Sequence, residues 1–184
     1  LPTSHERIKL LPASTALATL ERQSPGQSGL GLVIAKSLAQ LWGEFDHAVI
    51  DSPPLLGILM VNALAASQQL VIPVQTEFLA VKGLERMVST LAMINRSRKQ
   101  ALPYLIVPTL FDRRTQASMS TLRALRNSYP EQLWPAYIPV DTRLRDASRA
   151  GLTPSQFDSN CRAVLAYRAL LKHLLSLQPT AQVA

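Results

Sequence analysis

The chain has 184 residues, of which 47% are hydrophobic and 17% charged, a composition typical of a globular domain and not of a disordered segment. No apolar run reaches the ~18–20 residues of a transmembrane helix, and the single cysteine, Cys161, excludes an internal disulfide. The net charge of +7 favours an anionic partner such as nucleic acid, acidic lipid or nucleotide. We expect one domain spanning 1–184 and a cytoplasmic location.

Along the chain, short apolar runs typical of strands alternate with segments of helical periodicity. Thr115 is predicted to cap one helix and Gly151 to end another. The turn-rich stretch 24–29 is predicted to be a loop. The predicted strands are 7–13, 47–51, 69–75, 102–110 and 133–139. The predicted helices are 15–23, 30–42, 58–67, 79–99, 115–129, 142–151 and 161–177.

The alternation of strands and helices predicts an α/β fold. Because the strand-like runs are continuously apolar, we expect a layered, mostly parallel sheet with helices on both faces. Ligands of such folds bind at the carboxyl ends of the strands. The sequence therefore predicts that one edge of the sheet carries Asp51, Gln75, Thr109 and Pro139.

One of these strand ends has the pattern of a metal-nucleotide site. The run Ala48–Ile50 is apolar and ends in Asp51, which is followed by Ser52-Pro53-Pro54. A carboxylate at a strand tip can hold Mg²⁺, which in turn neutralises nucleotide phosphates. The same pattern also arises where an aspartate caps a turn, so the strand end alone leaves both interpretations open.

The residues after Asp51 resemble the ParA/MinD family of deviant Walker ATPases. The matching motifs occur in the family's order: Asp51-Ser52-Pro53-Pro54, Asn62-Ala63-Leu64, Ile72-Pro73-Val74-Gln75 with Glu77-Phe78, "TLFDRRT" at 109–115 and "IPVDTRLRDASRAG" at 138–151. The resemblance implies a P-loop NTPase-like fold whose first strands would precede this stretch.

The resemblance also implies roles for individual residues. Asp51 would be the catalytic Walker B carboxylate and would act through Mg²⁺. Residues that would shape the switch or bind the nucleotide are Pro53, Pro54, Gly57, Thr109, Phe111, Pro139 and Asp141. Arg114 and Arg143 would contact DNA non-specifically, with Arg113, Arg145 and Arg149 nearby in the sequence.

Two departures from the family pattern bear on function. The family's "IPRN" reads Ile138-Pro139-Val140-Asp141 here, so one arginine is lost and an asparagine becomes acidic. The family's phosphate-binding loop, "KGGxGK[ST]", does not occur in these 184 residues. Since phosphoryl transfer depends on such positioning groups, we expect this stretch alone to be catalytically silent and to be the C-terminal part of a longer enzyme.

The resemblance thus implies an ATPase segment that segregates DNA or positions protein assemblies. ATP and Mg²⁺ would be its cofactors, and non-specific DNA, a ParB-like or other adaptor protein and a second copy of the chain its partners. The alternative is a nucleotide-free binding module that acts through DNA or a partner protein.

Other chemistries find less support. The three histidines are scattered and Cys161 has no ligand spacing, which argues against zinc. The segment 161–177 is amphipathic, but its basic face is weak for a membrane-inserting helix, so we expect it to pack on the sheet.

Overall fold

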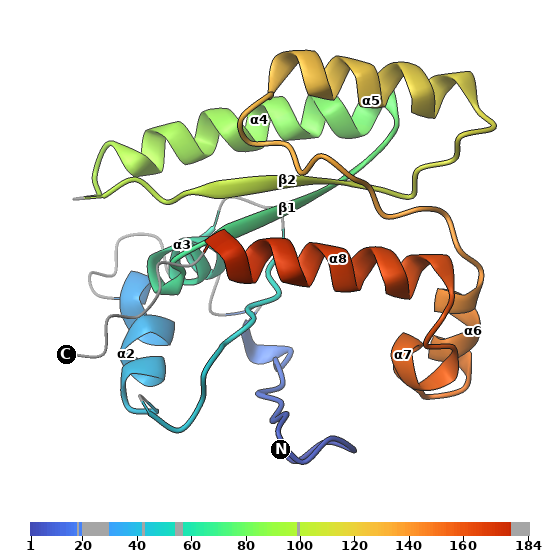
Figure 1. The fold of residues 1–184 in the computed structure, drawn as a ribbon. Coiled ribbons are helices and arrows are strands. Elements are labelled where there is room, and N and C mark those ends of the chain that lie inside the picture. The colour runs from blue at the N-terminus through green and yellow to red at the C-terminus, as the bar shows by residue number, and fades with distance from the viewer. Residues whose placement is uncertain (18, 20–29, 42, 54–56, 99, 178–184) are drawn as a thin grey trace. The chain divides into compact units, whose positions relative to one another are not determined.

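The structure is a computed structural model that describes residues 1–17, 19, 30–41, 43–53, 57–98 and 100–177. The predicted loop 24–29, most of the predicted helix 15–23 and Pro54 lie outside the described residues. The chain divides into two compact units, 1–68 and 69–184, which we describe separately. Figure 1 shows the elements of each unit along the colour gradient.

The first unit contains a 3₁₀ turn, η1 (Leu30–Leu32), followed by α2 (Val33–Ala39), and a second helix, α3 (Ile58–Ala66). The predicted helices 30–42 and 58–67 are therefore confirmed. Asn62 is buried, and its Oδ1 accepts the backbone N–H of Ile34 at 3.2 Å while its Nδ2 donates to the carbonyl of Ile58 at 2.9 Å. Asn62 of the motif thus ties α2 to α3.

The two predicted strands of this unit are wrong. Over 7–13 the structure has one antiparallel bridge, between Pro2 and Lys9, and over 47–51 it has neither a strand nor a bridge. Val49 is 97% exposed. A run of apolar residues becomes a strand only when a neighbouring strand accepts its hydrogen bonds. In the described part of this unit, only residues 1–2 pair with the first run, where Leu1 and Leu10 exchange backbone hydrogen bonds, and no strand pairs with the second run.

The second unit is built on two parallel strands, β1 (Leu70–Gln75) and β2 (Tyr104–Thr109). The register pairs Leu70 with Tyr104 and Gln75 with Thr109, so both strands end at the same edge. Both strands were predicted from their apolar runs, and both are confirmed.

In the described residues, the predicted strand 133–139 forms only isolated parallel bridges, from Leu133 to Ile106 of β2 and from Pro139 to Phe111 beyond the end of β2. The amide groups of Trp134, Ile138 and Val140 donate to carbonyls of β2 or of the residues that follow it. Two prolines in the segment have no N–H to donate, so the ladder is interrupted. The segment therefore follows the sheet as a broken third strand.

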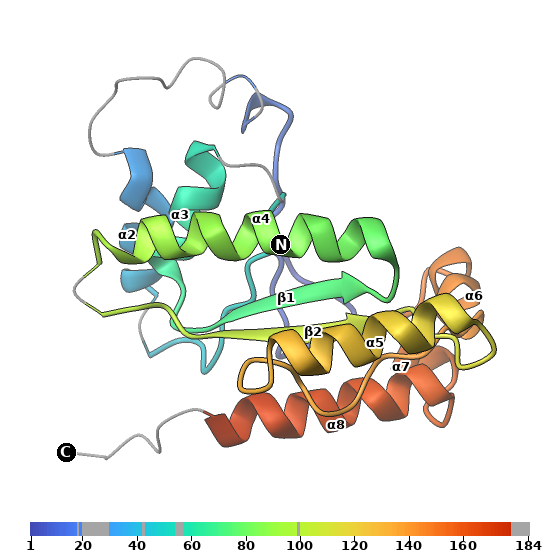
Figure 2. The same cartoon turned by 90° about the horizontal axis from the view of Figure 1, so that it is seen from above.

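Helices cover both faces of this sheet, as predicted. In Figure 1, α4 (Phe78–Asn95) and α5 (Gln116–Ser128) lie on one side of the strands and α8 (Arg162–Leu177) on the other. Figure 2 shows α4 and α5 side by side. The core under α4 and α5 contains Val74, Leu84, Ile106, Leu125 and Leu133. The core under α8 contains Leu105, Val107, Trp134, Ile138 and Leu170.

Two short helices, α6 (Arg143–Arg149) and α7 (Pro154–Phe157), connect the broken third strand to α8. Gly151 has a φ of 68° and ends α6 as predicted, because a left-handed residue stops a helix at low cost when it is glycine. Helix α7 was not predicted; Thr153 and Gln156 form a capping box at its start. None of the helices in the described part of the chain is long and apolar enough to cross a membrane.

Candidate nucleotide and nucleic-acid site

The carboxyl edge of the second unit's sheet is shaped by the residues that follow β2. Leu110 has a φ of 50°, a left-handed conformation that is uncommon for leucine. After this turn the chain returns to the sheet, and Phe111 bridges to Pro139 of the broken third strand. The segments 109–115 and 138–143, which are separated in the sequence by residues 116–137, are thereby brought together.

A cavity of about 710 Å³ opens at this edge. It combines aromatic, basic and acidic side chains, which suits a flat, anionic ligand. Its lining residues are Phe111, Asp112, Arg113, Arg114, Tyr137, Pro139, Val140, Asp141, Thr142, Arg162 and Ala166.

The aromatic wall of the cavity is the pair Phe111 and Tyr137. Their ring centroids are 4.1 Å apart and the rings are tilted by 42°. Phe111 is buried and Tyr137 half-buried, so Tyr137 exposes more of its side chain to the cavity. The two rings are in contact and together form one side of the cavity.

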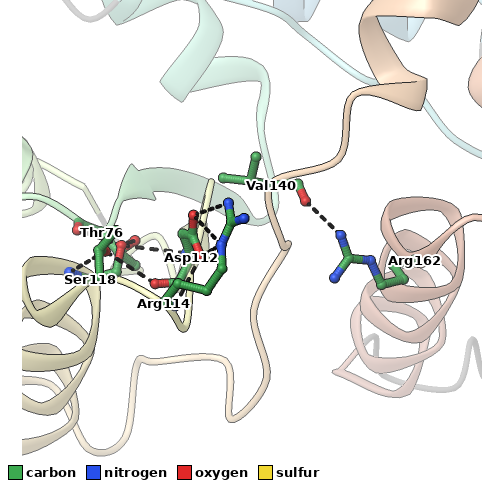
Figure 3. Close-up of polar contacts among 7 residues, drawn as sticks. Thr76, Asp112, Arg114, Ser118, Val140 and Arg162 are labelled. Atoms are coloured by element: carbon green, nitrogen blue, oxygen red, sulfur yellow. Dashed lines mark hydrogen bonds and ion pairs between the residues drawn. The ribbon is translucent and has the colours of Figure 1, made fainter.

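The loop after Phe111 holds an ion pair, drawn in Figure 3. Arg114 donates from Nε to both carboxylate oxygens of Asp112, at 2.9 and 3.2 Å, and from Nη2 to Oδ2 at 2.7 Å. The backbone N–H of Arg114 also donates to Asp112 Oδ1. The side-chain hydrogen bonds from Arg114, and after them its backbone N–H, lower the pKa of Asp112 to about 2. They also raise the pKa of Arg114.

This loop is anchored to the end of β1 by a buried pair of hydroxyls. The oxygens of Thr76 and Ser118 lie 2.9 Å apart, and both side chains are buried. The backbone N–H of Asp112 donates to Ser118 Oγ at 3.4 Å. Thr115 caps α5 as predicted, since its Oγ1 accepts the N–H of Ser118 at 3.3 Å. The position of Asp112 is therefore set by α5 and β1.

Asp141 joins the cavity wall to the start of α8. Its Oδ1 accepts the backbone N–H of Arg143 at 3.0 Å and its Oδ2 that of Ala163 at 3.1 Å. Burial alone would raise the pKa of Asp141, but these two N–H groups lower it on balance. The carboxylate that replaces the family's asparagine thus stabilises the first turn of α8.

Basic side chains are concentrated in the second unit. Residues 69–184 contain fifteen lysines and arginines against seven aspartates and glutamates, whereas residues 1–68 contain four against five. Arg143 Nε lies 3.7 Å from Asp158 Oδ2, a long ion pair. Arg162 donates to the carbonyl of Val140 at 3.4 Å and points to it in Figure 3.

The predicted site residues fall into two groups. The cavity contains Phe111, Pro139, Asp141 and Arg114, while Thr109 ends β2 in register with Gln75. Arg143 begins α6 of the second unit. Asp51, Pro53 and Gly57 belong to the first unit, where Asp51 and Pro53 are exposed and Gly57 precedes α3.

The cavity residues that were not predicted include Asp112, Tyr137 and Arg162. The sequence did contain a signal for Arg162. A cation in the first turn of a helix interacts unfavourably with the helix dipole, so a role other than stabilising α8 is expected for this arginine. Tyr137 carried no local signal, since only the topology brings it to Phe111.

The parallel sheet, covered on both faces and with a cavity at its carboxyl edge, places the chain in the class of α/β proteins that bind ligands at the ends of their strands. Residues 1–104 match the family model described as "AAA domain". The chain is 28% identical over 167 residues to the "Chromosome-partitioning ATPase Soj" of Treponema pallidum, covering 90% of this chain and 66% of Soj. It is 27% identical over 175 residues to the "Chromosome partitioning protein ParA" of Myxococcus xanthus, covering 95% and 62%.

Among solved structures, a cobyrinic acid a,c-diamide synthase of Mycobacterium smegmatis with a bound ATP analogue and magnesium superposes with a TM-score of 0.70. Its sequence is 29% identical, and the match covers 91% of this chain and 64% of that one. The chain belongs to the ParA/MinD family of ATPases and has their P-loop NTPase fold. It spans slightly less than two thirds of the length of these relatives.

Proposed function

We propose that this chain is the DNA-binding and base-binding part of a ParA-type ATPase that segregates DNA or positions a protein assembly. The observation that carries the proposal is the excess of basic side chains in residues 69–184, together with the aromatic and basic cavity at the sheet edge. Soj and ParA are named for chromosome partitioning. In this chain, ATP binding would promote association of two copies, and an adaptor protein would trigger release.

The cavity fits the base end of a nucleotide. Tyr137 and Phe111 offer ring surface, and Arg113 and Arg162 offer charge for a phosphate. Thr109, Pro139 and Asp141 would position the base, the last by holding its own loop in place. The phosphate end fits less well, because these 184 residues contain no "KGGxGK[ST]" sequence.

Magnesium would be held through Asp51. Mg²⁺ in nucleotide sites takes one or two carboxylates and completes its shell with phosphate oxygens and water. Among the described residues no group of three or more His, Cys, Asp or Glu is arranged to hold a metal ion. A single carboxylate such as Asp51 is therefore a ligand only when a nucleotide supplies the remaining oxygens.

The DNA part of the proposal is tested by binding of the chain to duplex DNA of random sequence across a salt series. A phosphate contact contributes about 0.9 to the slope of log K against log salt. We expect Arg143→Ala to weaken binding and to flatten that slope by about one unit. Glu131→Gln, which leaves all arginines in place, is the control. An unchanged slope in Arg143→Ala would remove Arg143 from the DNA surface.

The nucleotide part is tested by calorimetric titration of the 184-residue chain with Mg²⁺–ATP, with Asp51→Ala as control. Binding that is lost in Asp51→Ala supports the ATPase proposal for this chain. Binding of DNA without any binding of ATP would favour the second candidate, a nucleotide-free binding module. The absence of the glycine–lysine loop from these residues is the observation that favours that candidate.

A further inference from the structure

The side chain assigned to DNA at the cavity rim is already engaged within the chain. Arg114 makes three side-chain hydrogen bonds to Asp112, in the two-pronged geometry that a guanidinium also uses for phosphate. Nε and one Nη of Arg114 therefore face the carboxylate. A phosphate that approaches Arg114 in this geometry has to displace Asp112.

The two partners of this pair differ in how firmly they are placed. The side chain of Asp112 is 21% exposed and that of Arg114 is 81% exposed. The main chain of Asp112 is held by Ser118 Oγ and by Thr115, whose Oγ1 donates to the Asp112 carbonyl at 3.1 Å. Figure 3 shows Arg114 folded back over this anchored turn. The acid is thus part of the framework, and the arginine is the partner that can leave.

Exposed ion pairs of this kind are weak, since water and salt compete with them. A polyanion such as duplex DNA presents phosphates at high density and gains by releasing its condensed counterions. An isolated anion has no such gain. Only a ligand with a high density of negative charge can therefore compete with the Asp112 carboxylate for the side chain of Arg114.

We propose that Asp112 is a specificity-determining residue that withholds Arg114 from isolated anions and yields it to the phosphates of duplex DNA. The inference rests on the proposed DNA-binding function and adds to it a built-in competitor. Removal of the carboxylate leaves Arg114 free before DNA arrives. The expected result is tighter binding that depends on Arg114.

The test is a double-mutant cycle on duplex DNA of random sequence, with Asp112→Asn, Arg114→Ala and the combined variant. Asparagine keeps an acceptor for the Arg114 backbone N–H, so the turn is retained, and a thermal melt verifies this. We expect Asp112→Asn to bind DNA about two- to fivefold more tightly. This factor corresponds to the free energy of an exposed ion pair, which DNA no longer has to break in the variant. Arg114→Ala should flatten the salt slope by about 0.9. The combined variant should match Arg114→Ala.

Asp146→Asn, which removes the same charge from the exposed surface of α6, is the matched control. An equal gain of DNA affinity in this control, or a gain from Asp112→Asn that persists without Arg114, would show a general charge effect. Either result would overturn this inference and leave the proposed DNA binding standing. If no variant binds DNA, the inference and the proposed DNA binding both fall. Inorganic phosphate provides the selectivity arm: it should weaken DNA binding by Asp112→Asn more than by the unmodified chain, and equal competition would overturn the selectivity.

Discussion

Asp141 offers the sharpest test of how the site is built. Replacement by alanine removes the acceptors for two backbone N–H groups, those of Arg143 and Ala163. Loss of a helix cap costs about 0.5–2 kcal/mol, and loss of a carboxylate near a helix N-terminus costs a further ~0.3–1 kcal/mol. We therefore expect Asp141→Ala to lower the free energy of unfolding by about 1–3 kcal/mol, which corresponds to about 2–12 °C in Tm for a chain of this size.

Urea and thermal unfolding, followed by circular dichroism, measure this loss. Asp141→Asn, which keeps one acceptor, should lose less, and the exposed Asp146→Ala should change stability by less than about 0.5 kcal/mol. Because the pKa of Asp141 is lowered in the folded state, its contribution is present above the ordinary aspartate range and declines as the pH falls below about 4. Equal stability of Asp141→Ala and the unmodified chain at neutral pH would refute the capping role.

Two further variants test the framework around the site by the same unfolding measurements. Ser118→Ala leaves the buried hydroxyl of Thr76 without its partner at 2.9 Å and should cost about 1–3 kcal/mol, whereas Ser120→Ala on the exposed side of α5 should be near neutral; equal losses would show that the pair does not anchor the loop. Leu170→Ala should cost about 2–5 kcal/mol because Leu170 is 7% exposed, and the neighbouring Leu171, 55% exposed, should lose far less on the same change. The reverse order would mean that α8 packs through its other face.

Much of the second unit could be predicted from the sequence because its elements have strong local signals. The apolar runs of β1 and β2 and the helical spacing of α4, α5 and α8 each fix an element without reference to the rest of the chain. The run at 47–51 carries the same local signal and forms no strand, since pairing depends on a neighbour that the run itself does not specify. Helix α7, four residues long, is too short for periodicity to detect.

Motifs in the sequence marked some of the residues that line the cavity. Phe111, Pro139 and Asp141 were assigned from their motifs and line one cavity. Whether they bind nucleotide stays a prediction, as do the roles of Asp51, Pro53, Pro54, Gly57, Thr109, Arg114 and Arg143. The ring pairing of Tyr137 and the competition of Asp112 for Arg114 depend on distances that no motif encodes.

Cys161 is an intrinsic probe of local unfolding in this protein. It is the single cysteine of the chain, it is buried, and it precedes the first turn of α8, where Asp141 accepts the amide of Ala163. Cys161 packs with Ala163, Val164 and Leu144, so a thiol reagent should react faster when this packing opens, and the labelling rate reports such local openings without an introduced probe. A ligand bound in the adjoining cavity should slow the labelling of Cys161, and a variant that weakens the cap at Asp141 should accelerate it.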